Sequence, residues 1–399
     1  MGQVPRELDP RTSAAAAFGA ELRDRRVAAG RSQRGLGRLV LVSGALIEKI
    51  EKALRQPHPD LVRRLDVVLN ADGGLIRLAS DFLDMDEGGP VSRFEELSPD
   101  AAVERLRRLI IDVRNADHTM AADRVHDVVA CADAAEAVVP RASSRERVML
   151  RRTVAEAQQL AGWMMFDRGR TKAAEGLLAR ARVSAEQAQA FDLIGYIAGP
   201  NLAFIHTWSG DPARGAELAY GALAWANRSG NRRLSAFVAT MAARAHAKMG
   251  ESALCERMLA TAEAELEQHA GEDCDPYWLS VFDHTALAGH RGSCLLALGD
   301  SERSVRALRE QESSGPLVFV RNNIIWQLES AIASLTIGEL EAAYAGIDRA
   351  LDYAAPGSVT PRVIRVFRAA DHQLHAVARA EVAASDTHDR LHRFIASSG

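Results

Sequence analysis

The residues with the clearest chemical purpose lie at positions 43–52, where small and charged side chains alternate with apolar ones. On a helix over this range, Ile47 and Ile50 share one face, and small or charged side chains occupy the other. Small side chains allow close approach to base edges, and an alanine methyl can contact a thymine methyl. The pattern predicts a helix that enters the major groove of double-stranded DNA. The candidates for base-edge contact are Ser43, Gly44, Ala45 and Lys49.

Neighbouring polar residues suit the DNA backbone rather than the bases. Phosphate contacts fix the register of a protein on DNA without reading sequence. We assign this role to Gln33, Arg34, Lys52 and Arg55. Glu48 has two open interpretations: its carboxylate accepts a hydrogen bond from a cytosine amine, or it repels wrong registers.

The surrounding sequence predicts the elements that position these residues. Ser32 is a good N-cap for a short helix whose apolar stripe contains Leu36, Leu39 and Val40, and a tight turn separates it from the recognition helix. A first helix over residues 14–29 is expected to bury Phe18, Leu22 and Val27. Amphipathic segments at 60–70 and 75–83 complete a five-helix bundle, and residues 1–13 are expected to form a flexible arm.

This stretch resembles the helix-turn-helix of the Cro/phage-repressor (XRE-type) transcription regulators over about residues 17–83. The resemblance is carried by Ser32-Gln33, Leu36, the turn at 39–43, and Ile47…Ile50-Glu51. Two positions depart from the family pattern: Leu41 replaces the usual turn glycine, and Gly44 replaces a longer polar residue. The resemblance implies sequence-specific DNA binding, with a homodimer placing two recognition helices about 34 Å apart on an inverted repeat.

Charge and composition agree with a basic DNA-binding domain at the N-terminus, followed by an acidic domain that does not bind DNA. Residues 1–80 hold fourteen Lys and Arg against nine Asp and Glu, whereas the rest of the 399-residue chain holds 35 against 44. An alanine-rich sequence with few strand-like alternations predicts an all-α protein. Dispersed cysteines without CxxC spacing, and the lack of an eighteen-residue apolar run, favour a cytoplasmic protein outside the membrane.

Residues 84–100 contain Gly-Gly-Pro and acidic residues and are predicted to be a linker, so the second domain spans 101–399. Within it, five glycines recur at spacings of 41, 40, 49 and 39 residues, namely Gly169, Gly210, Gly250, Gly299 and Gly338. Positions seven before and five and twelve after these glycines are mostly small. An acidic residue follows four of the five. This pattern resembles the tetratricopeptide (TPR) repeat over about residues 150–355 and predicts an α-solenoid of helix pairs, with capping helices at 360–396.

In the TPR fold, the concave surface comes mainly from the first helix of each pair. The resemblance places these residues there: Trp163, Phe166, Asn201, Phe204, Trp208, Phe237 and Arg244. The aromatic side chains either pack as core or line a groove. A groove with one cation would suit a hydrophobic peptide or an amphipathic small molecule that bears an acid. Asn322 and Asn323 could hydrogen-bond a peptide backbone.

The sequence offers little support for catalysis or metal binding. No phosphate-binding glycine loop, GxSxG or HExxH occurs, so we expect no enzyme and no cofactor. The pairs His372/His375 and His388/His392 have metal-ligand spacing, but we interpret them as solvated and expect no metal.

The sequence thus predicts a homodimeric bacterial transcription regulator whose repeat domain senses a peptide or small-molecule effector. The alternative is a protein-interaction scaffold with weak or vestigial DNA binding, in which Leu41 and Gly44 mark decay of the helix-turn-helix.

Overall fold

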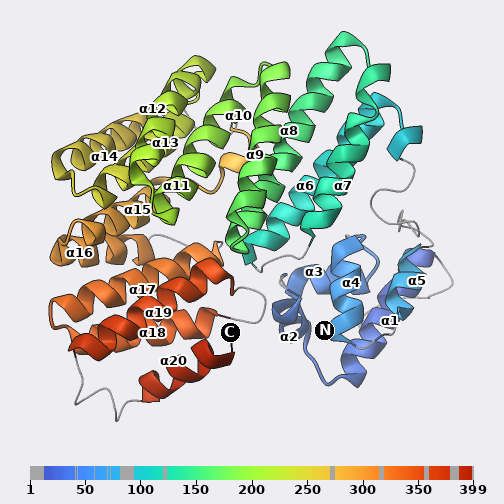
Figure 1. The fold of residues 1–399 in the computed structure, drawn as a ribbon. Coiled ribbons are helices and arrows are strands. Elements are labelled where there is room, and N and C mark those ends of the chain that lie inside the picture. Colours follow the sequence, from blue (N-terminus) through green and yellow to red (C-terminus); the bar gives the residue numbers. More distant parts are fainter. Residues whose placement is uncertain are drawn as a thin grey trace. The chain divides into compact units, whose positions relative to one another are not determined.

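The computed structural model of the protein separates into two units, residues 1–92 and residues 93–399. The structure describes residues 13–397 except for 41, 43, 58, 70, 72, 81–93, 120–123, 270–274, 314–318, 355–358 and 378–385. The predicted arm therefore lies almost wholly outside the described residues. Every regular element in the described ranges is helical (Figure 1). None of these helices is long and apolar enough to cross a membrane.

The first unit contains α1 (Ala14–Ala28), α2 (Gln33–Leu39), α3 (Gly44–Glu51), α4 (Pro59–Val68) and α5 (Gly74–Ser80). Ser13 caps α1, and the Ser32 hydroxyl caps α2 by accepting a hydrogen bond from the Gly35 amide at 3.0 Å. The helices enclose one core, to which α1, α2, α3, α4 and α5 each contribute, for example Phe18, Leu36, Ile47, Leu65 and Leu75.

Two expected core residues of this unit are on the surface instead. Val27 is 61% exposed and Leu39 is 48% exposed. The buried stripe of α1 runs through Phe18 and Leu22, and Val27 lies five residues further, more than a third of a turn away from that stripe. In the seven-residue α2, Leu36 and Gly37 are buried, as is the C-cap residue Val40, whereas Leu39 faces solvent.

The second unit is a series of stacked helix pairs (Figure 1). After a short helix η1 (Phe94–Glu96), the first pair is α6 (Pro99–Thr119) with α7 (Val125–Glu136), and the second is α8 (Ser144–Asp167) with α9 (Thr171–Gln187). The third joins α10 (Phe191–Tyr196), η3 (Ile197–Ala203) and α11 (Phe204–Ser209) in one long helix against α12 (Pro212–Ser229).

The remaining pairs are α13 (Arg232–Lys248) with α14 (Ser252–Glu267), α15 (His284–Ala297) with α16 (Ser301–Ser313), and α17 (Val320–Thr336) with α18 (Leu340–Tyr353). A short η5 (Tyr277–Leu279) precedes α15, and α19 (Pro361–Val377) and α20 (Asp386–Ser397) follow the last pair. The second unit begins inside the predicted linker, and Phe94 is buried in its core under the guanidinium of Arg105.

The repeat register read from the sequence is confirmed. All five punctuating glycines have positive φ, from 72° to 101°, and each lies in the turn between the two helices of a pair. The small residues aligned on them are buried where those helices cross. At Gly292, for example, an added Cβ would lie 2.4 Å from Leu308 of the partner helix. Small side chains thus set the close spacing of each pair.

The π-helical segment η3 interrupts the third pair at Pro200, which has no amide hydrogen to donate along the helix. Such π-segments are frequent at functional sites because they change the direction of nearby side chains. Here the buried residues of η3 include Asn201, one of the predicted ligand contacts.

Candidate DNA-binding face and ligand cavity

The predicted DNA-contact residues gather on the outside of α2 and α3. Ala45, Lys49 and Lys52 are exposed on or directly after α3, and Arg34 is exposed on α2. Arg55 is exposed just beyond. Ser43 lies outside the described residues. The exposed positions place several cations and a methyl group in solvent along one helix-turn-helix surface.

Three of the predicted contacts also serve within the unit. Glu48 pairs with Lys52 at 2.6 Å, so its carboxylate partly neutralises the positive charge of Lys52. Gln33 donates a side-chain N–H to the buried Glu51 at 2.8 Å. Glu51 also accepts a bidentate pair of hydrogen bonds from Nε and Nη2 of Arg26, at 2.5 and 2.9 Å. This network joins α1, α2 and α3, and so fixes the angle at which α3 is presented.

Gly44 has a structural role that the sequence did not reveal. A Cβ at this position would lie 2.9 Å from Arg34 Cγ and 3.0 Å from the Arg34 backbone nitrogen and Cα. The start of α3 therefore packs directly against the backbone of α2. Close helix contact explains the glycine better than decay of the motif does.

In the second unit, a cavity of about 100 Å³ opens among the first helices of the pairs. Its walls are contributed by α6, α8, the α10–η3–α11 helix, α13, α15, α17 and α19. The inner surface is therefore built from first helices, as predicted. Six of the seven predicted ligand contacts line it: Trp163, Asn201, Phe204, Trp208, Phe237 and Arg244.

The seventh predicted contact, Phe166, packs behind the wall. It is 4% exposed and meets Phe204 edge-on, with ring centroids 6.0 Å apart. Trp163 lies 5.8 Å from Phe204, and Phe204 stacks on Trp208 at 5.8 Å. The aromatic residues therefore act both as packing and as lining. Asn322 also lines the cavity, whereas Asn323 is buried and accepts a hydrogen bond from Gln311.

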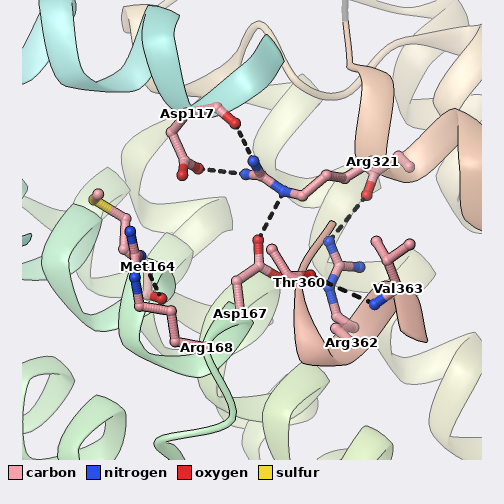
Figure 2. A network of polar contacts seen from close by, with 9 residues as sticks. Asp117, Met164, Asp167, Arg168, Arg321, Thr360, Arg362 and Val363 are labelled. Atoms are coloured by element: carbon pink, nitrogen blue, oxygen red, sulfur yellow. Dashed lines mark hydrogen bonds and ion pairs between the residues drawn. The ribbon is translucent and has the colours of Figure 1, made fainter. Parts of the chain in front are cut away.

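The sequence interpretation found one cation at the cavity, and the structure has four: Arg114, Arg244, Arg321 and Arg362. Two of them belong to a buried ion-pair network (Figure 2). Arg321 donates to Asp117 at 2.5 Å and pairs with Asp167 at 3.0 Å. Arg362 donates to the other oxygen of Asp167 at 2.5 Å.

We call these four residues (Asp117, Asp167, Arg321 and Arg362) the clasp. Asp117 and Asp167 lie on α6 and α8, at the beginning of the repeat series, whereas Arg321 and Arg362 lie on α17 and α19, at its end. The pairs span 204 and 195 residues of sequence. The solenoid therefore closes on itself through these side chains, and the cavity lies beside the closure.

The two carboxylates of the clasp differ in their ionisation. Burial opposes ionisation of Asp167, but the adjacent Arg362 and Arg321 outweigh it and lower the pKa of this carboxyl. Burial dominates at Asp117 and raises the pKa of its carboxyl despite Arg321. The arginines therefore favour the ionised form of Asp167, whereas burial opposes ionisation of Asp117.

The other two cavity arginines make no ion pair within the described part of the chain. Each acts electrostatically on one buried carboxyl, Arg114 on Glu156 and Arg244 on Glu329, but burial outweighs the arginine and raises the pKa of both carboxyls. Arg114 is 4% exposed, donates to Gln159 at 3.1 Å, and has a buried Nε without a hydrogen-bond acceptor. Arg244 contacts His290 Nδ1 at 3.2 Å and lies 5.3 Å from the Phe204 ring centre. Burial, followed by the charge of Arg244, lowers the pKa of His290 well below its ordinary value, so this imidazole is a neutral neighbour.

Comparison with known proteins identifies the class of the first unit. A model described as "Helix-turn-helix domain" matches residues 17–79, so the chain contains a helix-turn-helix domain joined to a unit of TPR-like helix pairs. No curated protein matches the chain.

Several solved structures resemble the whole chain weakly. A Rap protein complexed with competence and sporulation factor has 11% identity and a TM-score of 0.46, covering 96% of this chain and 97% of that one. The apo quorum sensor NprR from B. thuringiensis has 14% identity and a TM-score of 0.42, covering 83% and 95%. Bacillus thuringiensis PlcR, in complex with the peptide PapR7 and DNA, has 14% identity and a TM-score of 0.28, covering 84% and 98%. Functional conclusions therefore depend on the geometry of this chain.

Proposed function

We propose that this chain is a transcription regulator whose helix-turn-helix binds double-stranded DNA and whose repeat unit holds an acidic effector in the cavity. The observation that carries the effector assignment is the pair Arg114 and Arg244, two cations at an aromatic cavity without an ion-pair partner in the described chain. Cations held against aromatic faces and away from bulk water favour a bound anion.

The size of the cavity limits what can enter it unchanged. About 100 Å³ is well below the roughly 300–1,000 Å³ of pockets for drug-sized ligands. A carboxylate group fits, whereas a peptide or a whole amphipathic molecule requires the walls to separate. The clasp forms part of that wall, and a ligand carboxylate would compete with Asp117 and Asp167 for Arg321 and Arg362. Effector binding and closure of the solenoid are then coupled.

On DNA, α3 enters the major groove and a homodimer reads an inverted repeat. Ala45 and Lys49 face the bases, while Arg34, Lys52 and Arg55 face phosphates. The test is capture of genomic DNA by the purified full-length chain at a stated salt concentration. We expect an inverted repeat to be enriched. Recovery of no specific site, with and without effector, would favour the interaction scaffold.

A double variant, Lys49→Ala with Arg34→Ala, tests the residue assignment on the recovered site. We expect weaker binding and a salt dependence that is shallower by about one unit of slope for each phosphate that the protein no longer neutralises. Lys172→Ala, an exposed lysine of the repeat unit, is the matched control. Unchanged affinity and slope in the double variant would refute the assigned face.

The effector is tested with two probe sets: short apolar peptides and aromatic carboxylic acids, each as free acid and as amide. Free acids are expected to raise the melting temperature of the chain and amides are not. Arg244→Met should remove the effect, whereas Arg291→Ala, which breaks a partly exposed pair with Glu263, should preserve it. The heat-capacity change of binding distinguishes a peptide from a small molecule, because the peptide buries more apolar surface.

A further inference from the structure

The last two helices bring together side chains that belong to neither proposed site. Asp371 and His375 lie four residues apart on α19, and His388 and His392 lie four residues apart on α20. Residues at this spacing share one helix face. The two faces meet, and one ligand atom from each of the four side chains lies within 4.8 Å of the others. Three imidazoles and a carboxylate form a donor set that suits zinc and similar divalent transition metals.

The orientation of the donors fits a common metal ion. His375 Nδ1 donates a hydrogen bond to the Asp371 backbone carbonyl at 2.8 Å, which leaves the Nε2 lone pair for a metal. Nε2 of His375 lies 3.1 Å from Nε2 of His388. With metal–nitrogen bonds of about 2.0–2.1 Å, tetrahedral geometry places two ligand nitrogens about 3.3 Å apart. The observed separation is close to that value.

The carboxylate supplies a second, independent observation. Asp371 Oδ1 is buried, yet it accepts no hydrogen bond within the described residues. It faces two imidazoles, with His392 Nε2 at 3.6 Å and His375 Nδ1 at 3.4 Å. A buried carboxylate oxygen without a hydrogen-bond donor is costly unless a cation occupies the site.

The surrounding charges leave the cluster available to a cation. Arg390 of α20 is occupied by two carboxylates of α18, Asp348 at 2.5 Å and Asp352 at 2.7 Å.

We propose that Asp371, His375, His388 and His392 bind one divalent transition-metal ion of the zinc type, which joins α20 to α19. The joint would reinforce an apolar contact that already exists, in which Phe394 of α20 meets Phe367 of α19 with ring centroids 4.6 Å apart. The bound metal would thus hold the terminal cap of the repeat unit in place.

The test uses the full-length chain without a histidine tag, stripped with a chelator and titrated with zinc by calorimetry. We expect wild type to bind one zinc per chain at this site. The zinc affinity of His375→Ala and of His392→Ala should each be lower by more than about 100-fold, which exceeds the 10–100-fold loss typical of changes to residues that only support the ligands. His372→Ala is the matched control, because His372 is exposed on the same helix but outside the cluster. Both test residues are about half exposed, so we expect the alanine variants to fold.

Cobalt gives an independent measurement, since Co²⁺ in a tetrahedral site has intense visible absorption. The bands are expected in wild type and His372→Ala, and not in His392→Ala. Zinc affinity in His392→Ala equal to that of the control, or no saturable zinc binding by wild type, would overturn the proposal.

Discussion

The clasp makes a strong quantitative prediction, because its charges are buried and belong to opposite ends of the repeat series. Asp167 is 1% exposed, and each of its oxygens faces one arginine. Asp167→Asn preserves the shape of the side chain but removes its charge. Arg321 keeps Asp117, whereas Arg362 is left with a long hydrogen bond of 3.4 Å to Asn322 and the ring of Trp163. Breaking a buried ion pair in this way costs about 3–5 kcal/mol.

For a domain of this size, that cost corresponds to a fall of about 6–10 °C in melting temperature. Tryptophan fluorescence is a suitable assay, because all five tryptophans lie in the repeat unit and none in the helix-turn-helix unit. The matched control is Glu263→Gln, which breaks a partly exposed pair with Arg291. A pair that water can reach contributes about 0–1 kcal/mol, so the control should melt within about 2 °C of wild type.

A double variant, Asp167→Leu with Arg362→Met, separates the cost of an unpaired charge from the energy of the ion pair itself. Since this variant leaves no buried charge without a partner at α19, it should regain part of the stability that Asp167→Asn removes. The reasoning is refuted if Asp167→Asn melts within the range of the control.

Three further predictions concern the pH dependence of stability, the packing of Gly44 and the reactivity of a buried thiol. The pKa of the Asp167 carboxyl is lowered in the folded chain, so its ionised form stabilises the fold at neutral pH. This stabilisation is lost as the pH falls below the unfolded-state pKa of about 3.9. In denaturant titrations, the difference in unfolding free energy between wild type and Asp167→Asn should therefore shrink at acidic pH. Helix propensity alone predicts that Gly44→Ala stabilises the first unit by about 1 kcal/mol. The contact of the added methyl group with Arg34 instead predicts a net destabilisation of about 1–3 kcal/mol, measurable as a lower calorimetric melting temperature of this unit. A higher melting temperature would contradict this prediction. Burial raises the pKa of Cys131 to about 11, so mass spectrometry should find this thiol unlabelled by an alkylating reagent at pH 8 in the native chain and labelled after denaturation; equal labelling in both states would show that the thiol is accessible.

Local pattern predicted the features that depend on local spacing. Apolar periodicity and the Ser32 cap located the helix-turn-helix, and the recurring glycines located the helix pairs together with their inner faces. The error at Val27 arose because its apolar type was read without its angle on the helix. Gly44 was misjudged for a related reason: helix propensity is local, whereas the packing against Arg34 depends on the neighbouring helix.

The clasp and the histidine cluster could not be found in the same way. Arg321 and Asp117 are separated by 204 residues, and a sequence pattern carries no information about closure of a solenoid. His375 and His388 are on different helices, and each histidine pair alone has the spacing of many solvated pairs. A partial signal was present for the arginines, since Arg321 and Arg362 occupy first-helix positions where a repeat protein presents its inner surface.

The charge balance of the cavity connects closure to the proposed effector. Closure engages Arg321 and Arg362 with two carboxylates from the start of the series, while Arg114 and Arg244 make no ion pair within the described chain. An acidic effector that binds Arg114 and Arg244 alone leaves the clasp intact, and has little effect on the shape of the solenoid. An effector that also engages Arg321 or Arg362 must displace a buried aspartate, and so favours an open form. If Asp167→Asn weakens the clasp, it should therefore raise the affinity for the second kind of effector and leave the first nearly unchanged. Calorimetric titration of both proteins with the same free acid distinguishes the two, and equal affinities would exclude coupling between the effector and the clasp.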